Sequence, residues 1–241
     1  MIRKDQKIIT NPFSYLSEGL GNESSKTAII ADPFEFVFKY AYTIDPHDST
    51  NPIKNIPDRA YTRELIGMWL ESHSLLVVKS RQMMVTWLFC ALNLWLAMTQ
   101  QGQYIFFISK KEDDAGFSTS LSLLSRCFFI YDHLPKSVQL KYKKTISPST
   151  LVFPNRVSTM HGVSQDSDAV RQYTASSIFF DEMAFMEHAE QAFASIKPTL
   201  DGYKQRVKVG NVFLTLPKFA GVSTPNGKRN MFYKLVYDKQ E

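Results

Sequence analysis

Cysteine is scarce in this chain of 241 residues, where only Cys90 and Cys127 occur, far apart and within apolar stretches. Two distant cysteines give no disulfide framework, and with five scattered histidines they give no spacing typical of a zinc site. A nucleophile-elbow pattern of the Ser/His/Asp hydrolases is also missing. We therefore expect both cysteines to be small buried hydrophobic residues in a reducing compartment.

Long hydrophobic segments are absent as well. The longest apolar run, Leu88–Met98, is interrupted by Asn93 and is too short to span a bilayer. The first residues, M-I-R-K-D-Q-K-I-I-T-N-P, lack the apolar core of a signal peptide. We expect an intracellular protein with no membrane association.

Charge of one sign does not dominate, because 28 basic and 23 acidic residues leave a net charge of +5. This excess is compatible with a polyanionic partner but does not indicate one. Hydrophobic residues make up 44% of the chain, which excludes a disordered protein and is enough for one sizeable α/β domain.

From residue 57 onward, short apolar runs alternate with helical patterns. Helices are predicted from 58 or 59 to 71, from 86 to about 100, from 113 to 131 and around 189–196, with a hairpin within 145–162. The apolar runs predict buried strands at 75–78, 104–109, 177–180 and 219–223. Continuous apolar strands separated by helices predict a mostly parallel sheet with helices on both faces.

Residues 1–56 are expected to form an N-terminal arm and lead-in segment, and residues 57–241 the main domain. Residues 1–30 are polar and rich in turn formers. The spacing of aromatic residues in Asp32–Ala41 favours a helix, although a strand is also compatible with it. The prolines and small polar residues of Asp45–Ile56 predict a loop.

The first polar constellation lies between a predicted strand and the helix that follows it. It consists of Lys79, Ser80, Arg81, Gln82, Met83, Met84, Val85 and Thr86. A phosphate loop offers backbone N–H groups, a lysine and a hydroxyl for magnesium, usually as G-x-x-x-x-G-K-[ST]. Here Met84 and Val85 replace the glycine and lysine that precede the hydroxyl residue. The context predicts a nucleotide site, and a plain strand-to-helix turn is the alternative.

The second constellation is Asp181-Glu182, directly after an apolar strand. In nucleotide hydrolases an aspartate at this place holds magnesium, and a glutamate beside it can polarise the attacking water. The simpler explanation is that the two acids lie at a helix N-terminus, where the helix dipole favours negative charge. The third constellation, Ser223-Thr224-Pro225, again follows a strand; its hydroxyls could sense a γ-phosphate, or the segment is only a tight turn.

Together these segments resemble one family. K-S-R-Q-M at 79–83, D-A-V-R at 168–171, I-F-F-D-E-M-A-F at 178–185 and S-T-P-N-G at 223–227 are similar to motifs of the ATPase domain of tailed-phage terminase large subunits. The resemblance covers about residues 57–237. It implies a P-loop NTPase fold of the ASCE, or RecA-like, type, with a variant Walker A loop and a Walker B strand.

The resemblance also implies roles for individual residues. Asp181 and Thr86 would hold Mg²⁺, Glu182 would activate water, and Arg81 would act in cis on the γ-phosphate of ATP. Lys79, at the beginning of the loop, would replace the missing lysine, since a flexible lysine can bring its charge from either end of a compact loop. Ser223, Thr224 and Pro225 would couple hydrolysis to movement, Arg171 is an arginine that would contact the nucleotide site, and Arg59–Glu64 would lie near adenine.

The family's function would be hydrolysis of ATP to move double-stranded DNA into a procapsid, in the host cytoplasm. Its partners would be double-stranded DNA, the portal protein and procapsid, the small terminase subunit and further copies of the chain in a ring, of five by the resemblance. The family's C-terminal nuclease domain has no counterpart here, so we expect no DNA cleavage, and either a fragment or a motor split between chains. Two other readings stay open: a helicase-like nucleic-acid translocase, and an inert assembly module.

Overall fold

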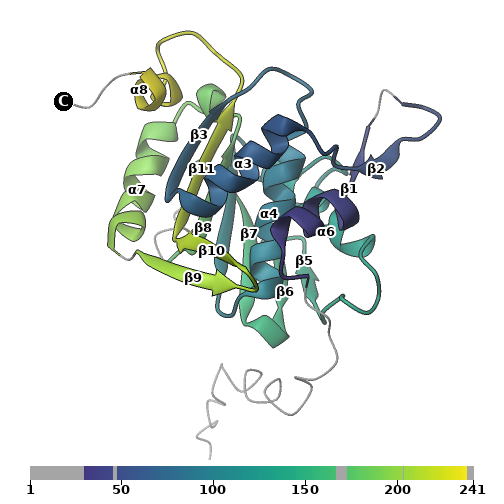
Figure 1. The fold of residues 1–241 in the computed structure, drawn as a ribbon. Coiled ribbons are helices and arrows are strands. Elements are labelled where there is room, and N and C mark those ends of the chain that lie inside the picture. The colour runs from purple at the N-terminus through teal and green to yellow at the C-terminus, as the bar shows by residue number, and fades with distance from the viewer. Residues whose placement is uncertain (1–29, 46–47, 167–172, 203, 238–241) are drawn as a thin grey trace, which may run out of the picture.

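The computed structural model describes residues 30–45, 48–166, 173–202 and 204–237. A seven-stranded, mostly parallel sheet lies between helices on its two faces (Figure 1). This arrangement confirms the fold class expected from the alternation of apolar strands and helices. Among the described helices, none is both long and apolar enough to cross a membrane.

The central sheet places the ends of its strands in a definite order. Its strands are β3 (Ser74–Val78), β11 (Lys218–Ser223), β8 (Ser177–Asp181), β4 (Tyr104–Ser109), β7 (Ser158–Ser164), β6 (Thr150–Phe153) and β5 (Lys143–Thr145). Strands β3 to β7 in this order run parallel, and β6 and β5 continue the sheet as antiparallel strands. In the register, Ser223 lies opposite Val78, and Val222 opposite Asp181. The three strands predicted to carry the site therefore end side by side.

Two hydrophobic cores lie on opposite faces of the sheet because successive strand residues point to opposite sides. In β4, Ile105 and Phe107 join the core formed with α3 (Ala60–Glu71), α4 (Val85–Thr99) and α6 (Leu123–Asp132). Their neighbours Phe106 and Ile108 join the other core, which is covered by α7 (Ala189–Gly202) and α8 (Met231–Tyr237). Figure 1 shows these two groups of helices on either side of the sheet.

The single helix predicted over 113–131 is wrong. The structure has a short α5 (Glu112–Ala115) and then α6, with an irregular segment between them. At Gly116 a Cβ atom would lie 2.2 Å from Oγ of Ser149, so the chain needs glycine there. Oγ of Ser122 donates to the carbonyl of Asp113, 2.6 Å away, and so competes with helical pairing.

Two strand pairs were missed. Part of the loop predicted at Asp45–Ile56 is strand β2 (Ile53–Asn55), which pairs with β1 (Tyr42–Ile44). The hairpin of β9 (Gln205–Val209) and β10 (Val212–Leu216) was not predicted either, although its alternating burial is typical of a strand.

Helical structure was predicted correctly for much of the remaining chain. Asp32 caps α2 (Pro33–Glu35), which continues into a π-helical turn at Phe36–Tyr40. Helix α7 is longer than expected, because it passes through Pro198 instead of ending before it. Short 3₁₀ segments lie at Pro154–Arg156 and Met183–Phe185.

The beginning of β11 is anchored by a buried lysine. The amino group of Lys218 donates hydrogen bonds to the carbonyls of Trp69, Leu70 and Ser72 at the end of α3, with distances of 2.8 Å to Leu70 and 2.9 Å to Ser72. Cations near a helix C-terminus are stabilised by its unpaired carbonyls. Lys218 thus fixes one end of the strand whose other end is Ser223.

Candidate active site

The loop at residues 79–86 joins β3 to α4 and contains no glycine. Its first residue, Lys79, continues from β3 and donates its N–H to the carbonyl of Ser223, 3.0 Å away. Gln82 and Met84 both adopt left-handed conformations, with φ of 64° and 55°. Met84 holds the position of the missing second glycine, so the conformation that glycine usually supplies is retained by a residue that rarely adopts it.

The end of this loop is fixed from both sides. The hydroxyl of Tyr61 on α3 donates to the carbonyl of Met83, 3.0 Å away. Val85 begins α4 and is buried, so its side chain belongs to the core and not to the loop.

Thr86 and Asp181 join the loop to the neighbouring strand end. Oγ1 of Thr86 donates to Oδ1 of Asp181 over 2.9 Å. A hydroxyl and a carboxylate at this distance offer two hard oxygen ligands on one side of a site. Burial raises the pKa of Asp181 above its usual range, against the attraction of Arg126 and the hydrogen bond from Thr86.

Lys79 and Glu182 form a second connection between the same elements. Nζ of Lys79 lies 2.7 Å from Oε1 of Glu182, and the lysine side chain is only 9% exposed. The other oxygen, Oε2, accepts hydrogen bonds from the backbone N–H and the hydroxyl of Thr224, both at 3.2 Å, and from Oγ of Ser223 at 3.3 Å. All three strand ends therefore meet at this carboxylate.

The two adjacent carboxyl groups differ in acidity. Burial acts to raise the pKa of Glu182, but the hydrogen bonds from Lys79 and Thr224 outweigh it and hold that pKa below its usual value. Burial dominates at Asp181 and raises its pKa. Neighbouring acids whose environments separate their pKa values are a frequent arrangement in active sites.

A cavity of about 720 Å³ opens over these residues. It is lined by Ile44, Asp45, Lys79, Arg81, Gln82, Met83, Met84, Val85, Thr86, Trp87, Leu121, Arg126, Asp181 and Glu182. Four residues predicted for the site do not line it: Ser80 and Pro225, which are exposed, and Ser223 and Thr224, which contact Glu182 from β11. Arg171, and Asp168 with it, lie outside the residues that the structure describes.

The fold and this site can be compared with solved structures. The HK97 bacteriophage large terminase superimposes on 86% of this chain with a TM-score of 0.60 and 10% sequence identity. The chain has the fold of a large terminase. It spans 40% of the length of the HK97 protein, which is therefore much the longer of the two.

Two further structures are of the large terminase ATPase domain of Thermus phage P74-26, one of them an arginine-to-alanine mutant. They match 74% of this chain and 68% of theirs at 16% and 15% identity, both with a TM-score of 0.46. No family model and no curated protein sequence matches the chain.

Within the terminase fold, a further arginine lies at the site that sequence reasoning missed. Arg126, in the first turn of α6, lines the cavity, and its guanidinium carbon lies 5.3 Å from the centre of the Trp87 ring. Trp87 and Asp45 also line the cavity without having been predicted. The sequence carries no local signal for them, because each comes from an element that reaches the site only through tertiary packing.

Magnesium fits the donor set of this site. Within the described ranges, no group of three or more His, Cys, Asp or Glu side chains is arranged to hold a metal. Mg²⁺ commonly takes only one or two protein ligands and completes its octahedron with phosphate oxygens and water. Thr86 and Asp181 would supply that share together with a bound nucleotide.

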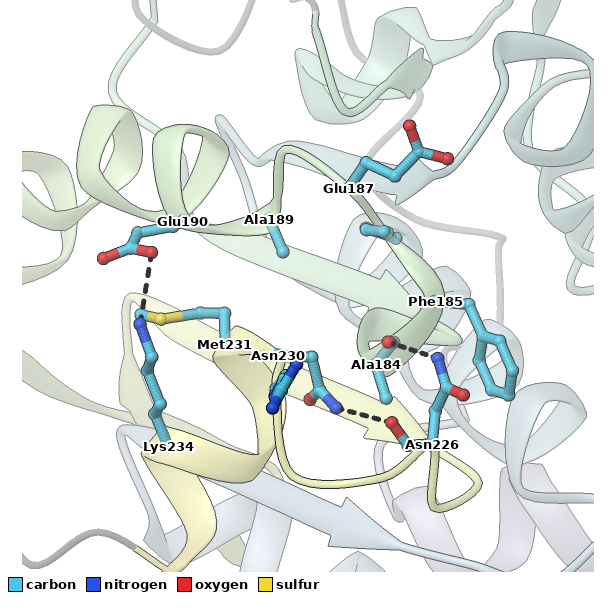
Figure 2. A pocket seen from close by; sticks show the side chains of 11 residues that line it. Ala184, Phe185, Glu187, Ala189, Glu190, Asn226, Asn230, Met231 and Lys234 are labelled. Atoms are coloured by element: carbon cyan, nitrogen blue, oxygen red, sulfur yellow. Dashed lines mark hydrogen bonds and ion pairs between the residues drawn. The ribbon is translucent and has the colours of Figure 1, made fainter.

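A second hollow, of about 300 Å³, lies beyond the carboxylates, between the 3₁₀ segment Met183–Phe185 and helix α8. Figure 2 shows Asn226 turned toward the main chain of Ala184, where its Nδ2 donates to the carbonyl at 3.0 Å. Nδ2 of Asn230 in turn donates to the carbonyl of Asn226 at 2.9 Å. Lys234 of α8 faces Glu190 of α7, 3.5 Å apart (Figure 2). Hydrogen bonds thus join Ala184, two residues after Glu182, through Asn226 and Asn230 to the start of α8.

Proposed function

We propose that this chain is the ATPase domain of a tailed-phage terminase large subunit, which hydrolyses ATP to move double-stranded DNA into a procapsid. The observation that carries the proposal is the meeting of three strand ends at the carboxylate of Glu182, which lines the cavity. There, Thr86 pairs with Asp181, and Lys79 pairs with Glu182. Ligands in parallel α/β sheets bind beyond the carboxyl ends of the strands, which is where these pairs lie.

Nucleotide binding would begin with an exchange of partners at Lys79. The lysine now neutralises Glu182, and the phosphates of ATP would compete for it. If the lysine moves to the phosphates, Glu182 loses its ion pair and its pKa rises. The carboxylate is then free to accept a proton from water. The hydrogen bonds from Thr224 and Ser223 would keep the carboxylate oriented during this exchange.

Mg²⁺, when bound, would neutralise charge on the phosphates. Asp181 and Thr86 would hold it from the protein side. Arg81 is exposed at the rim of the cavity and would stabilise the γ-phosphate during hydrolysis. Arg171 is proposed to contact the nucleotide site as well, on the resemblance alone.

Coupling to movement would use Ser223, Thr224 and Pro225. The hydroxyl of Ser223 accepts a hydrogen bond from the N–H of Ala184, 3.1 Å away. The N–H of Thr224 donates a hydrogen bond to Glu182. A change in the position of Glu182 during hydrolysis would therefore move both Ser223 and Thr224 at the end of β11. Asn226 extends these contacts to the segment that leads into α8.

The wider assignments rest on the same resemblance. Residues 57–241 would form the motor domain, with the preceding residues as an arm. DNA, the portal protein and procapsid, the small terminase subunit and a ring of copies, five by resemblance, would be its partners in the host cytoplasm.

The proposal is tested by measuring ATP binding and hydrolysis by the chain together with its procapsid and DNA. Glu182→Gln should still bind ATP but lose at least about 100-fold in turnover, the usual contribution of a general base. Glu187→Gln is a matched control, because Glu187 is exposed and paired with Lys110 at 2.6 Å. Absence of ATP binding by the unchanged chain would support an inert assembly module. Full stimulation by DNA without a procapsid would support a helicase-like translocase.

A further inference from the structure

Arg126 is anchored at the cavity by packing, and no ion pair joins it to a carboxylate of the described residues. It belongs to the first turn of α6, and its guanidinium lies over Trp87, the residue after Thr86. Trp87 is buried and is held in turn by the edge of Phe129, with ring centres 5.7 Å apart. The aromatic face fixes the plane of the guanidinium while leaving its N–H groups available.

Donor groups of Arg126 are left without acceptors. In the part of the chain that the structure describes, Nε of Arg126 is buried and has no hydrogen-bond partner. Buried donors without a partner are rare in proteins, and each one calls for an explanation such as a missing ligand. The simplest acceptor would be an anion that enters the cavity.

The position of Arg126 defines which part of a ligand it would meet. Besides the cavity over the loop, it lines an adjacent hollow of about 320 Å³, which contains Ser109 and Asp114 but no residue of the loop 79–86. The residues common to both spaces are Leu121, Arg126, Asp181 and Glu182. Arg126 therefore lies where the two spaces meet, beside Asp181 and Glu182.

We propose that Arg126 binds the terminal phosphate of the nucleotide, beside the carboxylates of Asp181 and Glu182. The inference rests on the proposed function, because it requires a nucleoside triphosphate in this cavity. A triphosphate cradled by the loop would extend its last phosphate toward Glu182, where water must attack. A planar guanidinium can donate two parallel N–H groups to one phosphate, which an ammonium group cannot do.

A terminal-phosphate contact predicts a difference between two ligands. Arg126→Gln should weaken binding of a non-hydrolysable ATP analogue with Mg²⁺ at least about tenfold, equivalent to about 1.4 kcal/mol. Binding of ADP with Mg²⁺ should change much less, because ADP lacks the phosphate concerned. The turnover number should fall together with ATP affinity. Lys197→Gln, which removes a surface charge paired with Asp201 on α7, is the matched control and should change neither affinity.

Two further variants separate phosphate binding from a structural role. Arg126→Lys keeps the charge but not the planar fork, so it should lose ATP affinity selectively and to a smaller extent. Arg126→Ala should regain turnover when guanidinium ion is added at concentrations that do not unfold the protein. If Arg126→Gln and Arg126→Lys weaken ATP and ADP equally, or weaken neither, the inference is wrong while the proposed function can stand. If the unchanged chain binds no nucleotide, both are wrong.

Discussion

The amino group of Lys79 lies 2.7 Å from Oε1 of Glu182, so the lysine at the start of the loop neutralises the acid that would activate water. The same glutamate accepts hydrogen bonds from the hydroxyls of Ser223 and Thr224 at the end of β11. Each of the three strand ends thus contributes a group to one carboxylate. Under the proposed function, this arrangement would be a resting state, and ATP would have to take Lys79 away from Glu182 before hydrolysis.

Asp181 should reduce the stability of the free protein. Because burial raises its pKa above the ordinary 3.8, the folded protein binds this proton more tightly than the unfolded chain. Its ionisation therefore opposes folding as pH rises through the folded pKa. We expect Asp181→Asn to raise the free energy of unfolding at neutral pH by about 0.5–2 kcal/mol, as is common when a functional group is removed. Chemical denaturation of both proteins measures this difference in the free energy of unfolding.

The control for this prediction is Asp201→Asn, because Asp201 is exposed and paired with Lys197 on the surface of α7. It should not stabilise the protein. Asp181→Asn should also lose the additional stability that Mg²⁺ with nucleotide gives the unchanged chain. A destabilised Asp181→Asn would contradict the prediction.

Met84 provides a test of the glycine-free loop. Glycine adopts a φ of 55° without steric penalty, whereas a residue with a β-branched side chain is strained in this conformation. We expect Met84→Gly to keep nucleotide binding. Met84→Val should weaken it, because holding valine in the left-handed conformation costs about 1–2 kcal/mol. Titration with a fluorescent ATP analogue distinguishes the two variants, and equal binding by both would show that the loop does not need this conformation.

His161 should make the fold sensitive to acid. Its ring stacks on Phe106 with centres 4.9 Å apart, and its Nε2 is buried without a partner among the described residues. Burial lowers the pKa of His161 from 6.5 to about 4. Between these values the unfolded chain binds a proton that the folded chain does not, so stability falls as pH drops from 6.5 toward 4.

The slope from this one group is at most about 1.4 kcal/mol per pH unit. His161→Phe keeps the stacked ring and removes the titration. Urea unfolding of both proteins between pH 7 and pH 4 should therefore show a smaller loss of stability in the variant. Parallel curves over that range would contradict the assignment to His161.

Much of the fold was predictable because local signals and tertiary packing agree. Strand β4 was predicted with its observed bounds, Tyr104–Ser109, since six apolar or small residues in a row suit only a strand covered on both faces. The break before α6 was missed, although Gly116 and the hydroxyl residues after it were a signal for it. The need for glycine there depends on Ser149, which is distant in sequence.

The residues of the site also divide into those that could be predicted from the sequence and those that could not. Thr86 lies just after β3 and Asp181 ends β8, with β11 between these strands in the sheet. The alternation of strands and helices was enough to place both residues at the carboxyl edge of one parallel sheet. Arg126 could not be found, because its place depends on how α6 packs against Trp87. The left-handed backbone at Met84 was equally hidden, since nothing in the residue type indicates it.

The most direct measurement is the rate of ATP hydrolysis by the Lys79→Ala protein in the assembled motor, with procapsid and DNA present. The side chain of Lys79 is 9% exposed and is the lysine of the loop, so no other loop residue can supply its charge at the same place. We expect hydrolysis to be abolished, while the unchanged chain and Lys197→Ala hydrolyse ATP normally. Hydrolysis by Lys79→Ala at the unchanged rate would contradict the assignment of Lys79 as the phosphate-binding lysine.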